Sequence, residues 1–211
     1  MLIQVRHQII FCYFISQVFH VGQSNTVYYF DVQNEHFEEA LNLFSSFFTC
    51  PLFTESSTFR EINAVDSENT KNLQSDMWRE FQLFKSLAAP GHPFTSFSTG
   101  NLDTLKNTPE KVNLNIRDLM IQFYNTHYSA NRMKVVCYGN QPLDTLQQWV
   151  EAKFQAIPNK NLSEFHVSPE VYPASRTGKL LEVVPIKDTK SIAFYFSWPP
   201  VEHKYRSKPD R

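Results

Sequence analysis

Glycine is scarce in this chain: 5 of the 211 residues are glycine, and no two of them lie closer than nine positions apart. Dinucleotide-binding loops and P-loops need closely spaced glycines, because backbone N–H groups must approach a phosphate with no side chain in between. The sequence therefore excludes a Rossmann-type nucleotide site and a P-loop NTPase.

Cysteine is also rare, and the net charge is close to zero. The three cysteines, Cys12, Cys50 and Cys137, form no C-x-x-C pair, so neither a local zinc ribbon nor a redox motif is present. Separated thiols of this kind fit a reducing compartment, and we expect a cytoplasmic location. The formal net charge of -1 gives no general attraction for nucleic acid, so we expect no nucleic-acid partner.

Long hydrophobic runs are missing as well. The apolar run at residues 9–15 is too short to cross a bilayer, so we expect no membrane span. The same run has the length of a signal-peptide core, although no small-residue cleavage site follows it. A buried strand, or a segment foreign to the fold, explains residues 1–25 equally well, and this segment stays unassigned.

What the chain does contain is a series of amphipathic segments. Runs rich in aromatic and β-branched residues predict strands at 26–32, 133–138, 179–185 and 191–198. Apolar residues that recur every three or four positions predict helices at 37–48, 57–85, 112–128 and 142–157. We therefore expect an α+β fold, in which an antiparallel sheet is covered on one face by helices.

Few residues are spaced for catalysis. No two histidines lie within ten positions of each other, so a helical H-x-x-x-H zinc pair is absent, and there is no G-x-S-x-G for a serine hydrolase. One pair of carboxylates stands out. Glu61 and Glu68 are seven residues apart, which places them on one helix face about 10 Å apart along the axis. Two glutamates on a solvated helix give the same pattern, so the spacing alone leaves their role open.

The residues around this pair form a longer pattern. The string R-E-I-N-A-V-D-S-E at 60–68 resembles the zinc-ligand helix of the pitrilysin or insulinase family of metallopeptidases. Other segments match that family in the same order, and the resemblance extends from about Thr26 to the C-terminus. These segments are Y-Y-F-D-V at 28–32, G-H-P-F at 91–94, S-T-G-N at 98–101 and V-P-I-K-D at 184–188.

The resemblance implies a zinc endopeptidase that acts on peptide substrates. In this family an inverted H-x-x-E-H helix supplies two histidine ligands and a general base, and a glutamate farther along supplies the third ligand. By position Glu68 matches that third ligand, and Glu61 matches an acidic residue that supports the metal site from outside the ligand set. Three protein ligands leave one zinc position open for water, whose pKa the metal lowers.

The chain departs from this pattern because it contains no H-x-x-E-H, and so lacks two histidine ligands and the general base. We interpret it as an internal fragment of a metallopeptidase that is inactive alone and retains no zinc without the remaining domains of the full-length enzyme. The expected parts are the later portion of an incomplete first metallopeptidase domain (26–157), a linker (158–178) and the start of a second, truncated domain (179–211). The alternatives are a non-catalytic family member that acts as an interaction or substrate-binding scaffold, and a helix-rich interaction module.

Overall fold

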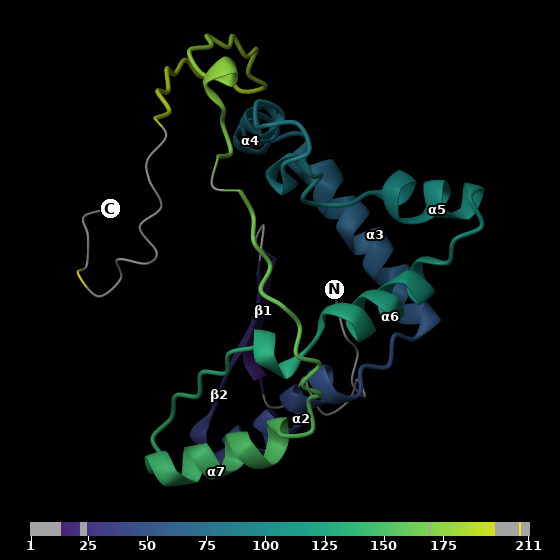
Figure 1. Ribbon diagram of the computed structural model, residues 1–211, viewed down its shortest axis with the longest axis vertical. Helices are drawn as coiled ribbons and strands as arrows, with labels where there is room; N and C mark the ends of the chain where they lie inside the picture. The colour runs from purple at the N-terminus through teal and green to yellow at the C-terminus, as the bar shows by residue number, and fades with distance from the viewer. Residues whose placement is uncertain (1–13, 22–24, 169, 197–206, 208–211) are drawn as a thin grey trace. The chain divides into compact units, whose positions relative to one another are not determined.

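The computed structural model describes residues 14–21, 25–168, 170–196 and 207 (Figure 1). The chain divides into two compact units. The first unit consists of Met1–Ser67 and Thr99–Glu164, and the second consists of Glu68–Ser98 and Phe165–Arg211. No helix among the described residues is long and apolar enough to cross a membrane.

Helices make up most of the regular structure. In chain order the elements are β1 (Phe14–Val21), β2 (Thr26–Val32), η1 (Asn34–His36), α2 (Phe37–Thr49), α3 (Glu55–Asn72), α4 (Asp76–Ser86), η2 (Pro93–Thr95), η3 (Asp103–Asn107), α5 (Thr108–Lys111), α6 (Ile116–His127), η4 (Ala130–Arg132), α7 (Leu143–Phe154) and η5 (Ala174–Arg176).

The predicted α+β fold with an antiparallel sheet covered by helices is wrong. The described residues are mostly helical, and their strand content is the antiparallel β1–β2 hairpin. The segments 133–138, 179–185 and 191–196, which we expected to be strands, pair with no other strand among the described residues; residues 197 and 198 lie outside them. High β-propensity does not make a strand by itself, because the ladder hydrogen bonds require a neighbouring strand.

The helix predictions agree better. Those for 37–48, 112–128 and 142–157 are confirmed as α2, α6 and α7 with shifted ends, but the single helix expected at 57–85 is two helices. The break lies at residues 73–75, where the Ser75 N–H donates to the Asn72 carbonyl oxygen and Ser75 itself is extended. Ser75 precedes Asp76, and this Ser-Asp pair is typical of a helix start.

The first unit is built around aromatic side chains from α2. Its buried cluster contains Phe47, Phe48 and Ile157, and the Phe48 ring lies 5.3 Å from the Tyr28 ring and 6.2 Å from the Phe154 ring. Helix α7 therefore packs along α2, as Figure 1 shows. Each fully buried side chain of this size stabilises the fold by about 1.5–3 kcal/mol.

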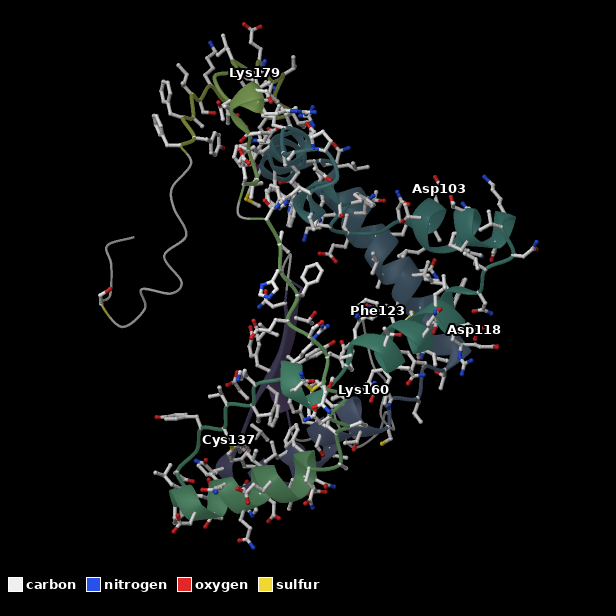
Figure 2. The ribbon with its side chains drawn as sticks, in the orientation of Figure 1. Asp103, Asp118, Phe123, Cys137, Lys160 and Lys179 are labelled. Carbon is white, nitrogen blue, oxygen red and sulfur yellow. The ribbon has the colours of Figure 1, made fainter. Side chains whose placement is uncertain are left out.

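A polar network fixes the segment that follows α7 onto the end of α6. Ser129 is fully buried, and its hydroxyl donates to Asn131 Oδ1 and accepts the Lys160 N–H. The ammonium group of Lys160, labelled in Figure 2, donates to the Asn125 carbonyl oxygen at 2.5 Å. The start of the expected linker is thus tied to the first unit by specific hydrogen bonds.

The second unit has an aromatic core around a buried lysine. Lys85 is 1% exposed, its Nζ donates to the Ser96 carbonyl oxygen, and it lies 5.5 Å from the Phe81 ring centroid and 5.8 Å from that of Phe94. Burial lowers the pKa of the Lys85 ammonium. The turn 92–96 is fixed further by His92, whose Nδ1 accepts the Phe94 N–H. The ring proton therefore sits on Nε2, which donates to the Ser168 carbonyl oxygen.

Candidate metal-ligand helix

Helix α3 carries both expected site residues, and its sequence is mostly polar. It begins after Thr54, whose hydroxyl accepts the Ser57 N–H and so caps the helix. Arg60 adds a hydrogen bond to the Ser57 hydroxyl. Ile62 is the one buried apolar side chain in the helix, so most of the surface of α3 is free to carry polar groups.

Glu61 and Glu68 lie two turns apart on α3, as the sequence predicts, but their surroundings differ. Glu61 belongs to the first unit and is partly buried, with its Oε2 shielded from solvent. Glu68 begins the second unit and is exposed, and its carboxylate makes no hydrogen bond or ion pair with any other residue that the structure describes. Its carboxylate is therefore the one accessible to an ion or ligand.

The loop that contains Gly100 and Leu102 packs against α3 at Val65 and Asp66, which lie between Glu61 and Glu68. The Leu102 N–H donates to Asp66 Oδ1 at 2.9 Å. A Cβ on Gly100 would lie 3.1 Å from Val65 Cγ1 and 2.6 Å from Leu105 Cδ1, so only glycine fits this approach without a shift. The sequence does not predict this contact. Asp66 and Gly100 each lie in a segment that resembles the metallopeptidase family, but nothing in either segment indicates that the two residues meet.

The described residues do not by themselves fit a complete zinc centre. A catalytic zinc needs three protein ligands, and within the described ranges no group of three or more His, Cys, Asp and Glu side chains could hold a metal ion. Of the two glutamates on α3, Glu68 offers an exposed carboxylate, whereas the carboxylate of Glu61 is partly buried.

An open cleft of about 540 Å³ lies beside the first half of α3, within the first unit. One wall is formed by α3, with Glu55, Thr58, Phe59 and Ile62, and the segment from η3 to the start of α6 forms the other. Lys106 lies over the Phe59 ring, 5.3 Å from its centroid. Neither Glu61 nor Glu68 lines this cleft, so the cleft is separate from the expected ligand position.

Comparison with known proteins first assigns the chain to a class of proteins, the peptidases. Residues 20–91 match the family model described as "Insulinase (Peptidase family M16)", and residues 115–211 match the one described as "Peptidase M16 inactive domain". The helix that carries Glu61 and Glu68 lies inside the first match. The chain belongs to the insulinase family, peptidase family M16.

Individual relatives agree with this. The insulin-degrading enzyme of Bos taurus is 41% identical over 199 residues, which are 90% of this chain and 19% of that protein. The putative zinc protease mug138 of Schizosaccharomyces pombe is 40% identical over 190 residues, which are 90% of this chain and 20% of that protein. The crystal structure of pitrilysin superposes with a TM-score of 0.70 at 29% identity, over 76% of this chain and 17% of pitrilysin. The chain thus spans about one fifth of the length of these relatives.

Proposed function

We propose that this chain contributes to zinc-dependent hydrolysis of peptides by supplying the helix that carries one metal ligand. Glu68 is the ligand, and Glu61, two turns earlier on α3, supports it. One observation carries the proposal: the two carboxylates on α3 differ in their surroundings. That of Glu68 is exposed and has no partner among the described residues, whereas that of Glu61 is partly buried. Membership of the M16 family and the names of its relatives, an insulin-degrading enzyme and a putative zinc protease, support it.

We further propose that the chain alone is inactive and does not bind zinc with the affinity of a complete catalytic site. One carboxylate cannot hold zinc in a three-ligand geometry, and hydrolysis needs a base to take a proton from the attacking water. The residues of this chain would then act only together with histidines from the rest of an M16 enzyme, and its peptide substrates would be those of that enzyme.

A chimera tests the proposal directly. The matching segment of the S. pombe protease is replaced with residues 26–196 of this chain, and zinc content and cleavage of a quenched peptide are measured. We expect Glu61→Gln to lower zinc affinity or activity by about 10–100-fold, as is usual for groups outside the ligand set, and Glu68→Gln to lower them further. The control is Glu80→Gln, an exposed glutamate on α4, which should change neither.

Two results would contradict the assignment. A larger loss of zinc from Glu61→Gln than from Glu68→Gln would reverse the two roles. Cleavage of the peptide by the unaltered 211-residue chain, inhibited by a chelator and lost in Glu68→Ala, would show that the chain is a complete enzyme.

A non-catalytic scaffold is the second candidate, and one observation favours it. Ile192, Phe194 and Phe196 are 85%, 80% and 87% exposed, which is unusual for large apolar side chains and typical of a contact surface. Under this reading the chimera retains its zinc and activity in Glu68→Gln, and the chain alone binds peptides without cleaving them. Fluorescence anisotropy of a labelled peptide measures that binding.

A further inference from the structure

The backbone of residues 184–187 is held by two charged side chains at the start of α4, all within the second unit. Asp76 Oδ1 accepts the Ile186 N–H at 2.8 Å, and Asp76 Oδ2 accepts the Lys187 N–H at 3.1 Å. Arg79 Nη1 donates to the same Asp76 Oδ1 at 3.0 Å and to the Val184 carbonyl oxygen at 3.1 Å. One ion pair therefore engages three backbone groups of the segment.

The composition of this arrangement suits backbone binding. A carboxylate accepts several hydrogen bonds at once, and two successive N–H groups satisfy both of its oxygens. Charge-assisted hydrogen bonds of this kind are roughly twice as strong as neutral ones. Asp76 is also the first residue of α4, where a negative charge is favoured by the helix dipole. The Asp76 side chain is 18% exposed and that of Arg79 36%, so the pair is partly protected from water.

The two sides of this contact belong to different family matches. Asp76 and Arg79 lie in the region matched by the insulinase model, residues 20–91, and residues 184–187 lie in the region matched by the inactive-domain model, residues 115–211. Residues 189–196, with the exposed Ile192, Phe194 and Phe196, follow directly. A contact at 184–187 thus fixes the point from which this apolar segment leaves α4.

We infer that Asp76 and Arg79 form a clamp that positions residues 184–187, which lie inside the inactive-domain match, on α4. The clamp, defined as these two side chains and the backbone of residues 184–187, goes beyond the proposed function and needs neither metal nor peptide. Asp76 is its centre, since it makes two of the three backbone contacts. Arg79 is a positioning residue that orients the carboxylate and adds the third.

The charge on Asp76 makes the clamp dependent on pH. The N–H groups of Ile186 and Lys187 are the main reason that the pKa of Asp76 lies below its ordinary value, with a further contribution from Arg79. A depressed carboxyl pKa means that the clamp is fully present above pH 3.8, the ordinary value, and is lost as the pH falls through the lower value of the folded protein. Besides Arg79, the charged residues that follow closest in the sequence are Glu80 on α4 and Lys187 and Asp188 in the segment, all of them exposed.

Amide hydrogen exchange of the full 211-residue chain tests the clamp. In Asp76→Ala, exchange at the amides of Ile186 and Lys187 should become about tenfold faster or more, because bonds to a charged acceptor contribute at this level. Arg79→Gln should accelerate them less. The matched control is Asp188→Asn, which removes an exposed carboxylate from the same segment and should leave both amides unchanged. Equal exchange in the unaltered chain and Asp76→Ala, or an equal effect of Asp188→Asn, would overturn the inference.

The amide of Ala88 shows whether a variant has unfolded, because Ala88 is 1% exposed, lies in the same second unit as the clamp and donates its N–H to the Lys85 carbonyl oxygen. If Asp76→Ala also exposes Ala88, the pH dependence of the unaltered protein provides the test. Exchange of its Ile186 and Lys187 amides, corrected for the intrinsic effect of pH, should rise below pH 3.8 while the Ala88 amide stays protected. A rise at all three amides together, or at none, would show that Asp76 holds no separate clamp.

Discussion

At the scale of single residues, two half-buried tyrosines show how the fold controls ionisation. The hydroxyl oxygens of Tyr28 and Tyr128 lie 2.5 Å apart and share a hydrogen bond, which joins β2 to the residue that follows α6. Burial is the main cause of the raised pKa of both groups, and the shared bond raises that of Tyr28 further. The folded protein therefore keeps these two hydroxyls neutral under conditions in which an exposed tyrosine has ionised.

This pair predicts a loss of stability in alkali. A tyrosine whose pKa is raised by folding contributes stability that is present below its unfolded pKa of 10.0 and is lost as the pH rises above it. We expect the free energy of unfolding, measured by urea denaturation, to fall above pH 10 less steeply in the Tyr28→Phe/Tyr128→Phe double variant than in the unaltered chain. The control is Tyr29→Phe, an exposed neighbour on β2, and an identical slope in all three proteins would contradict the prediction.

At the scale of elements, helices could be predicted from the sequence and the sheet could not. The apolar repeat of α2 and α7 is local, and each helix closes its own hydrogen bonds. The break between α3 and α4 is also local in origin, but the apolar residues on both sides of it continue a helical pattern and so predicted one uninterrupted helix. Residues 133–138 have a strand composition, yet a strand needs a partner, and nothing in a local sequence says whether one is present.

The packing of α7 on α2 can be tested with two leucines on the same helix. Leu146 is 6% exposed and Leu143 is 82% exposed. Leu146→Ala should lower the free energy of unfolding by about 2–5 kcal/mol, because it leaves a cavity as well as removing buried area. Leu143→Ala should change it by less than about 0.5 kcal/mol. Chemical denaturation of the two variants measures both values, and equal effects would mean that α7 is not packed as described.

At the scale of the whole molecule, the contacts that matter most join distant parts of the sequence. The positions of Glu61 and Glu68 on one helix follow from their spacing, and so could be predicted. The Asp66 contact with Leu102 crosses 36 residues, and the Asp76 contact with Ile186 crosses 110. Contacts over such separations depend on the tertiary fold, so no local pattern identified Asp66 or Asp76. The predicted domain boundaries at 157 and 178 stay predictions.

The exposed apolar residues of the second unit predict self-association. Ile192, Phe194 and Phe196 are more than three-quarters exposed, and their segment pairs with no strand among the described residues. Unpaired apolar segments of strand-like composition act as templates for pairing with another chain. Size-exclusion chromatography with light scattering should show concentration-dependent association that Phe194→Lys/Phe196→Lys reduces. Leu143→Lys, which alters an apolar side chain that is 82% exposed on helix α7, should leave it unchanged. A strictly monomeric chain would contradict this.

The division into two units also gives the molecule two separate optical reporters. Trp149 lies edge-on to Phe37 in the first unit, with ring centroids 6.1 Å apart, and Trp78 lies near Phe81 in the second, at 6.0 Å. With Trp198 replaced by Phe, single-tryptophan forms that keep only Trp149 or only Trp78 report on one unit each. Their emission spectra then follow the melting of each unit independently, so that coincident or separate transitions reveal whether the break between the units is also a break in cooperativity.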